Sequence, residues 1–318
     1  MEGKRRKRIL QGGPALGVIA GLIVLVHSVS EGQGTTEYKP ATWNFPGARS
    51  AALGNAASSD PYDIEGMYQN PAVLSFLRNP SGVLDYRHDW SNRVSQENTA
   101  VPILAGHKTS FGVGIGVENS GKLTRNEALS FTQLDIDAAC AFRFPGAESD
   151  VSLGILCEFR AGRDDSLSHT AAQFSVGLLY APAAGPSYSI VYRGLGKTIA
   201  YSSASGAGGN STRGRLEESP RSLEIGSTMR FPDLYRTPLL TFSVAGERDF
   251  ISRIFRLKGG MEMTFFKMLN LRMGYAKAET AQLSCGAGFS IALFSLDYAI
   301  MPSVQSGQFN EVTLKVAI

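Results

Sequence analysis

The sequence predicts an all-β protein, an antiparallel transmembrane β-barrel of about fourteen strands that follows a small N-terminal segment. From Gly82 onward, apolar residues alternate with Gly, Ser, Thr and charged residues, which is the period of a β-strand with two unlike faces. Many of these segments run for about 9–12 residues, enough for a tilted crossing of a bilayer. Alternation alone would also fit a soluble β-sandwich, so the length of the strands and the order of their connections favour the barrel.

The first 34 residues are expected to be an export signal. The basic run Lys4–Arg8 precedes the apolar run Ala15–Val26, which is shorter than the roughly 20 apolar residues of a membrane-spanning helix. Pairs of small residues near positions 30 and 34 offer cleavage sites. We therefore predict a signal peptide at 1–34, and a single N-terminal anchor helix is the alternative.

Composition argues against several classes of function. The formal net charge is +3, but residues 1–34 hold five basic and two acidic residues, so the remaining chain is nearly neutral and no nucleic-acid partner is expected. Three Cys and four scattered His give neither a disulfide framework nor a metal-binding spacing. No nucleophile and base pattern is recognisable, so we expect no catalytic residue, no metal and no cofactor, and a protein that is not an enzyme.

The barrel is expected to span residues 82–318. A clear example of its strands is the run in which Phe111, Val113, Ile115 and Val117 alternate with Ser and Gly. About fourteen such segments can be counted, an even number that closes a barrel with both ends on one side. They begin near residues 82, 97, 109, 133, 150, 170, 187, 222, 238, 256, 269, 281, 294 and 310.

The connections sort by parity, as in bacterial outer-membrane barrels, which have short turns on one rim and long loops on the other. The tight connections, after even-numbered segments, are 106–108, 145–150, 182–186, 232–237, 267–268 and 292–293. The long ones, after odd-numbered segments, are 119–132, 162–168 and 194–221. The last of these is polar and Gly/Ser-rich, which suits either a partner-binding loop or mobile surface decoration.

The side chains on the polar face of the strands carry both signs of charge. Those expected to face the lumen are Asp85, Arg87, Asp135, Asp137, Arg143, Glu158, Arg160, Arg193, Glu224, Arg230, Glu247, Lys258, Glu262, Arg272, Asp297 and Lys315. Unlike charges that pair in a solvated lumen explain this set, and an ion path is the alternative. On the apolar face, Phe142, Leu153, Val176 and Leu314 should contact lipid.

Residues 42–80 cannot supply strands of a barrel wall, and we expect 35–81 to form a plug segment. They are rich in Ala, Gly, Ser, Asn and Pro, and Pro71 and Pro80 would interrupt any long helix. A short helix is expected at 48–57 and a further turn at 66–76. Irregular backbone at membrane depth survives only where protein or water surrounds it, which favours a place inside the barrel, and a disordered leader is the alternative.

This segment carries an ordered set of motifs. Gly47-Ala48-Arg49 and Gly54 are followed by Asp60 and then by Asn70-Pro71-Ala72. The set resembles the N-terminal block of the PorV/PorQ family, outer-membrane barrels related to the FadL long-chain fatty-acid transporters. A Gly-rich strand at 286–289 before Asp297-Tyr298-Ala299 is similar to the last strands of that family. The resemblance implies a plug at 35–81 inside the lumen, with the Asn-Pro-Ala corner in the interior and Asp60 as the nearby acid.

The resemblance also implies a place and two functions. The place is the bacterial outer membrane, with its lipid as a partner. The first function is an accessory of protein export, of the type IX secretion kind, which binds a translocon or an exported cargo protein. The alternative is a FadL-like channel whose ligand is a hydrophobic small molecule, and a purely structural barrel is a third reading.

Overall fold

The computed structural model of the 318-residue chain describes residues 47–63, 65–77, 81–89, 94–105, 108–120, 131–164, 167–203, 213–217, 221–232, 238–303 and 307–317. All of them belong to one of two compact units, Ala41–Ile318. The other unit, Met1–Pro40, contains the expected signal peptide and lies outside the described residues, as does the first part of the 35–81 segment. Both boundaries therefore stay predictions.

Fifteen strands and three short helices make up the described part of the chain. The helical elements are α2 (Gly47–Ala52), α3 (Gly66–Gln69) and the 3₁₀ helix η1 (Pro71–Phe76). The strands are β1 (Ser81–Asp89), β2 (Val94–Ala105), β3 (Thr109–Ser120), β4 (Phe131–Pro145), β5 (Ser149–Asp164), β6 (Leu167–Pro182), β7 (Ser187–Ser203), β8 (Arg213–Glu217), β9 (Ser222–Pro232), β10 (Pro238–Asp249), β11 (Phe255–Phe265), β12 (Leu269–Lys277), β13 (Ala281–Ile291), β14 (Phe294–Ser303) and β15 (Gly307–Ala317).

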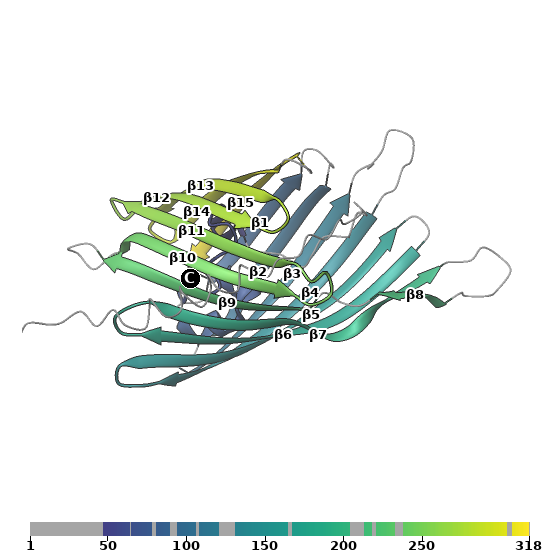
Figure 1. Ribbon diagram of the computed structural model, residues 1–318, viewed down its shortest axis with the longest axis horizontal. Coiled ribbons are helices and arrows are strands. Elements are labelled where there is room, and N and C mark those ends of the chain that lie inside the picture. The colour runs from purple at the N-terminus through teal and green to yellow at the C-terminus, as the bar shows by residue number, and fades with distance from the viewer. Residues whose placement is uncertain are drawn as a thin grey trace, which may run out of the picture. The chain divides into compact units, whose positions relative to one another are not determined.

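The strands form one antiparallel sheet that closes on itself (Figure 1). Each strand pairs with its sequence neighbours, except that β7 pairs with β9 beyond the short β8. The sheet closes where β1 pairs with β15, with Leu84 opposite Leu314 and Asp85 opposite Thr313. Fourteen of the described strands make the closed wall, and β8 adds only a short pairing to β7. The predicted barrel and its strand count are confirmed.

Two predicted connections are wrong, and both are replaced by strand. The loop expected at 162–168 is mostly strand, because β5 continues to Asp164 and β6 begins at Leu167. The loop expected at 194–221 is partly strand, because β7 runs to Ser203 and β8 follows at Arg213–Glu217; residues 204–212 lie outside the described residues. At these ends β5 and β7 extend past the apolar part of the wall. There the backbone ladder continues, but lipid no longer requires an apolar face, so the sequence pattern disappears before the strand ends.

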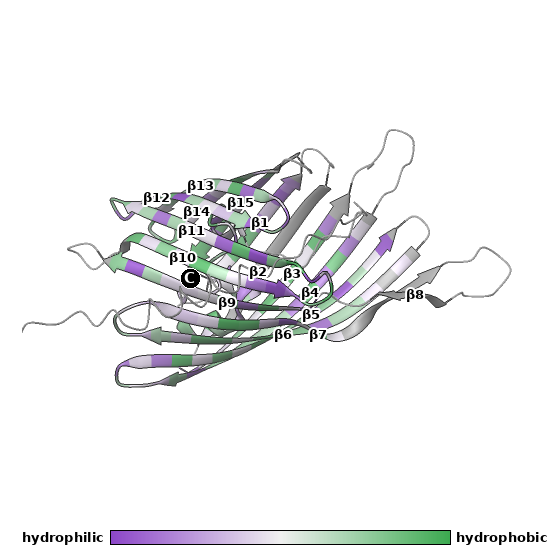
Figure 2. Cartoon of the chain, in the orientation of Figure 1, coloured by the Kyte–Doolittle hydropathy of each residue, from purple (hydrophilic) through white to green (hydrophobic). Residues whose placement is uncertain are grey.

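The two faces of the wall differ as predicted. Phe142 and Leu153 are exposed on the outer face, whereas Asp137 and Glu158 are buried on the inner face. The alternation of green and purple along the strands in Figure 2 follows this pattern. Because hydrocarbon offers no hydrogen-bond partner, polar side chains face inward and apolar ones face lipid. In the described part of the chain no helix is long and apolar enough to cross a membrane.

The segment 47–77 lies inside the barrel and is called the plug below. Its helix α2 contacts β12–β15, and η1 contacts β2–β6. The described part of this segment is therefore packed against opposite sides of the wall, which contradicts the alternative of a disordered leader. The helical turns expected at 48–57 and 66–76 are present, the first one shorter than expected because the left-handed Gly54 and Asn55 end it.

Candidate functional site

The Asn-Pro-Ala corner is built by its own side chains. The Oδ1 atom of Asn70 accepts a hydrogen bond of 3.1 Å from the backbone N–H of Ala72 and so caps η1. Pro71 suits the first helical position, because its fixed φ fits the helix and no N–H is needed there. The Nδ2 atom of Asn70 donates to the carbonyl of Ser58 at 2.9 Å, which ties the corner to the preceding loop. Asn70 therefore both caps η1 and connects it to the loop that carries Ser58.

The plug backbone lies directly against glycines of the wall. A Cβ atom on Gly154 of β5 would collide with the backbone of Pro71 and Ala72. A Cβ atom on Gly274 of β12 would collide with the backbone of Leu53 and Gly54. These positions read as small lumen residues in the sequence, and the structure shows why they are glycine: the plug occupies the space of their side chains.

Arg49 of α2 is the centre of a buried ion-pair cluster. Its Nε and Nη2 atoms each donate to the carboxylate of Glu262 on β11, at 2.9 Å. Its Nη1 and Nη2 atoms also donate to Asp63 at 3.0 Å and to Asp60 at 2.8 Å. One guanidinium thus joins two acids of the plug to one acid of the wall, and its fixed fork explains why Arg rather than Lys suits the position.

The cluster continues around the wall beyond Arg49. Glu262 also accepts from Arg272 of β12 at 2.6 Å, and Arg272 donates to Asp297 of β14 at 2.6 Å. Lys315 of β15 pairs with Asp297 at 2.9 Å and with Glu65 of the plug at 2.8 Å. Lys315 also lies 3.2 Å from Asp63, and Arg230 of β9 pairs with Asp60. We call these nine residues the Arg49 cluster: Arg49, Asp60, Asp63, Glu65, Arg230, Glu262, Arg272, Asp297 and Lys315.

Five carboxylates face four cations in the Arg49 cluster, and Glu65 is the carboxylate whose charge is least favoured. Burial, together with the nearby charges of Asp63 and Asp297, raises the pKa of Glu65 to about 8 against the opposing effect of Lys315. Burial alone would raise the pKa of Asp60 and Asp63 as well. Arg49 and Arg230 outweigh the effect of burial at Asp60, and Lys315 and Arg49 outweigh it at Asp63. The pKa values of both acids therefore lie below the usual range. A protonated Glu65 leaves the cluster electrically balanced.

A second group of paired charges lies on the inner faces of β7 and β9–β11. Glu224 accepts from Lys258 at 2.7 Å and from Arg193 at 3.2 Å, and Lys258 lies 2.8 Å from Glu247. Arg193 also donates to the backbone carbonyl of Gln69 in the plug. The predicted pairing of unlike lumen charges is confirmed, but Glu224, Glu247 and Lys258 are buried, which corrects the picture of a solvated set.

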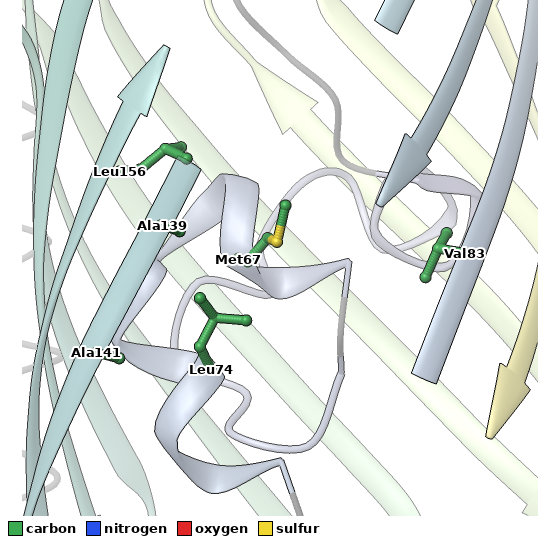
Figure 3. Close-up of a cluster of buried hydrophobic side chains, with 6 residues drawn as sticks. All are labelled: Met67, Leu74, Val83, Ala139, Ala141 and Leu156. Atoms are coloured by element: carbon green, nitrogen blue, oxygen red, sulfur yellow. The ribbon is translucent and has the colours of Figure 1, made fainter. Parts of the chain in front are cut away.

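One side of the plug contacts an apolar part of the inner wall. Met67 and Leu74 of the plug pack with Ala139 and Ala141 of β4 and with Leu156 of β5, and Val83 of β1 completes the cluster. Figure 3 shows Leu74 and Met67 between the strand that carries the two alanines and the strand that carries Val83. We call five of these residues the apolar patch: Met67, Leu74, Ala139, Ala141 and Leu156. Two further apolar clusters join the plug to the wall, one where α2 packs on Ala299 and Met301 of β14 and one where η1 packs on Leu179 of β6.

Neutral hydrogen bonds, rather than ion pairs, hold the η1 side of the plug. Ser75 donates to the hydroxyl of Ser152 on β5 at 2.7 Å, and Ser152 donates to the carbonyl of Ala72 at 2.8 Å. Farther along the plug, Ser59 shares a hydrogen bond of 2.8 Å with Thr228 of β9. Apolar contacts hold both ends of the plug, but the described ion pairs reach α2 and the loop after it, whereas η1 is held by hydroxyl hydrogen bonds.

The structure divides the predicted motif residues between these places. Arg49 and Asp60 meet in the Arg49 cluster, Gly47 lies against the side chain of Glu65, and the N–H of Ala48 donates to Thr313 at 2.8 Å. Gly54 lies against the backbone of Tyr275 on β12, and Asn70, Pro71 and Ala72 lie against β5 and β6. Sequence reasoning missed Asp63 and Glu65. Their spacing after Asp60, in a segment with few other charges, was the available signal.

The cysteines have no part in this site. Cys140, Cys157 and Cys285 are free thiols, and Cys285 is exposed. Among the described residues no group of three or more His, Cys, Asp or Glu side chains could hold a metal ion.

Comparisons with known proteins support the fold but not a family. No model of a protein family matches the sequence, and no curated protein matches it. The chain is structurally similar to the CymD monoaromatic hydrocarbon channel, with a TM-score of 0.60 and 12% identity over 87% of this chain and 98% of that one. It is similar to the toluene transporter TodX of Pseudomonas putida, with a TM-score of 0.58 and 14% identity over 85% and 96% of the two chains.

A Pseudomonas aeruginosa FadL homologue gives the same result, with a TM-score of 0.58 and 13% identity over 87% of this chain and 98% of that one. These identities establish the fold and nothing finer. The narrower PorV/PorQ resemblance stays a prediction. The chain has the fold of the FadL-like transmembrane β-barrels.

Proposed function

We propose that this protein is a channel of the bacterial outer membrane that admits small hydrophobic molecules, with the plug as its gate. The observation that carries the proposal is the apolar patch between the plug and the inner wall, which the apolar contacts of Leu179 on β6 extend along η1. A path for polar solutes alone has no need of apolar side chains such as Leu156 and Leu179 on its wall, whereas an apolar solute needs them to leave water. The structural neighbours named for hydrocarbons and toluene support the same substrate class.

The attachment of the plug supports a local opening at η1. Releasing α2 would break a buried guanidinium from three carboxylates, which is costly because the separated charges stay desolvated. Releasing η1 would break hydroxyl hydrogen bonds such as Ser75 to Ser152, each worth about 0.5–1.5 kcal/mol, and would uncover apolar side chains such as Leu74, a cost that an apolar solute on the same surface offsets. The η1 turn is thus the part of the plug that moves at lower cost, and its movement exposes the apolar patch to a solute.

The protein-export reading depends on the sequence resemblance. No described feature of the barrel or plug favours binding of a translocon or cargo protein over solute passage, so the channel is the function proposed. A translocon or cargo partner stays a prediction of the resemblance. A partner-binding role for the 194–221 region stays a prediction from its polar, Gly/Ser-rich composition.

A disulfide across the gate tests the proposal. The Oγ atoms of Ser75 and Ser152 lie 2.7 Å apart, so Ser75→Cys with Ser152→Cys should form a disulfide with little movement. The background carries Cys140→Ala, Cys157→Ala and Cys285→Ala. We expect oxidised double-cysteine protein in liposomes to lose uptake of labelled toluene and to regain it on reduction.

Controls separate the gate from the barrel. Each single-cysteine variant should take up toluene at the same rate under oxidising and reducing conditions. Uptake that is insensitive to the closed disulfide would exclude movement of η1 as the gate. No uptake by the reduced protein, in an assembled barrel, would exclude the hydrocarbon-channel function itself.

A further inference from the structure

A pair of buried carboxylates borders the apolar patch on the inner wall. Asp137 of β4 lies directly opposite Glu158 of β5 in the strand register. The next pair on the same face of these strands is Ala139 opposite Leu156, and both of those residues belong to the patch. On these two strands the apolar surface therefore ends at two neighbouring acids that face the same side of the wall.

The hydrogen bonds of these two acids are incomplete. Asp137 is only 3% exposed, yet its Oδ1 atom has no hydrogen-bond partner among the described residues. Glu158 accepts hydrogen bonds from the side chains of Gln173 at 2.9 Å and of Ser175 at 3.4 Å. These neutral donors orient the carboxylate of Glu158 without adding a positive charge. The unpartnered oxygen of Asp137 is thus a buried acceptor that is ready for a donor.

The wall does not neutralise the two acids either. Arg160 follows Glu158 on the inner face of β5, but it pairs with Asp135 at 2.7 Å. No ion pair between described residues includes Asp137 or Glu158. Like charges directly opposite each other on two strands are destabilising, and burial increases the cost. A cation from outside the chain would remove both penalties.

The plug covers this place with a side chain that has an apolar and a polar part. The ring of Tyr68, in α3, packs against the apolar cluster that contains Met67 and Leu74. Its hydroxyl lies over Gly114 of β3, where an added Cβ atom would collide with it and would lie 3.2 Å from Oδ2 of Asp137. Tyr68 thus places an apolar body against the patch and a polar head near the acids. A ligand that takes its place needs the same two parts.

We propose that Asp137 and Glu158 bind the ammonium group of a small apolar amine. The hydrocarbon part of that amine lies on Ala139 and Leu156, in the place that Tyr68 fills when the plug is closed. The inference rests on the proposed channel function, because the solute reaches this place when the plug moves. An ammonium group donates hydrogen bonds to both acids and offsets their repulsion, whereas a carboxylate would add a third negative charge. The site therefore selects amines over organic acids.

Equilibrium dialysis of the full chain in detergent tests the site without requiring transport. The ligand is labelled benzylamine. Labelled toluene has the same ring without the amine, and labelled benzoate has the opposite charge. We expect the wild-type protein to bind benzylamine more tightly than either of the other two. Asp137→Asn combined with Glu158→Gln should weaken benzylamine binding about tenfold and leave toluene binding unchanged.

Two further variants separate recognition from a structural role. Tyr68→Ala vacates the place over the patch, so it should tighten benzylamine binding, which a merely structural loss would not do. Glu247→Gln is the matched control, because it removes a buried lumen carboxylate of β10 that pairs with Lys258 at 2.8 Å. It should leave the binding of all three ligands unchanged. If the double carboxylate variant does not assemble into a heat-modifiable barrel, each single variant is measured in its place.

Uptake by liposomes, measured alongside binding, distinguishes a failure of this site from a failure of the channel. A barrel that takes up toluene, but binds benzylamine no better than toluene even as Tyr68→Ala, would overturn the amine site and leave the channel function in place. Carboxylate-dependent benzylamine binding in a barrel that takes up neither solute would overturn the channel and leave the site. Benzylamine binding that survives the loss of both carboxylates would also overturn the site.

Discussion

Arg49 and Glu262 form a bidentate ion pair in which Nε and Nη2 of the guanidinium each lie 2.9 Å from a carboxylate oxygen. The two residues are 213 positions apart in the sequence and join the first helix of the plug to strand β11. Both side chains are largely buried, so neither charge has water as an alternative partner. The pair therefore fixes where the plug sits in the wall.

Replacing Arg49 should release the α2 end of the plug. Arg49→Gln leaves three acids without their shared partner, and losing one member of a buried ion pair costs about 3–5 kcal/mol. Arg49→Lys should recover only part of that loss, because an ammonium cannot pair bidentately. Hydrogen exchange of amides in 47–63, measured by mass spectrometry, should rise strongly. Arg248→Gln, an exposed charge on β10, is the control and should change nothing.

Docking of the plug should weaken as the pH rises through neutrality. The pKa of Glu65 is about 8 when docked and returns toward 4.5 when the plug is released, so the docked state binds the additional proton. The contribution of Glu65 is complete below about pH 4.5 and is lost as the pH rises toward 8. Asp60 and Asp63 have lowered pKa values and act oppositely, since their contribution is lost below about pH 4.

Together these groups place the strongest docking near pH 5, where amide exchange in the plug should be slowest. Lys315, Asp63 and Asp297 are the charged groups around Glu65, and Glu65→Gln leaves all three in place. This variant should remove the rise in amide exchange between pH 6 and 8, measured at intervals of about one pH unit. A wild-type plug whose exchange, corrected for intrinsic rates, stays flat over that interval would contradict the assignment.

A single methyl group on the inner wall should displace the η1 end. Gly154→Ala puts a Cβ atom into the space of the Ala72 backbone, and overpacking of this kind costs about 1–3 kcal/mol. The barrel should still assemble, while leakage of a small dye from proteoliposomes increases. Gly82→Ala is the matched control, because its added Cβ would meet nothing within 4 Å. Equal leakage from both variants would show that the plug does not depend on this contact.

The depth of a lipid-facing position should determine the cost of a charge there. Leu153 lies on the outer face of β5, opposite Phe142 and farther from the turn than Phe144, so Leu153→Arg should lower the free energy of unfolding by about 2–4 kcal/mol. Phe144 lies one residue from the end of β4, and Phe144→Arg should cost about 0–1 kcal/mol. Urea titration of both variants in detergent and lipid measures the difference. The same cost at both sites would contradict the strand placement in the bilayer.

The barrel can be predicted from the sequence alone, because lipid requires an apolar side chain at every second residue of a strand that faces it. A strand such as Phe111–Val117 must present apolar side chains on one face wherever it touches hydrocarbon, and that local rule is legible without knowing the partner strands. The predicted starts of β3, β7, β9, β10, β12, β13 and β14 match the structure for this reason. The rule lapses outside the membrane, so the ends of β5 and β7 were misread as loops.

The contacts of the lumen residues cannot be predicted in the same way. The sequence marked Arg49, Asp60, Glu262 and Lys315 as charged, but their pairing crosses up to 252 positions, as from Lys315 to Asp63, and no periodicity reports it. The sequence shows that Gly154 is a small residue of a strand, but it does not show that the Asn-Pro-Ala corner packs against it. Partners inside a closed barrel are set by the register of fourteen strands, so these contacts exist only once the wall has closed.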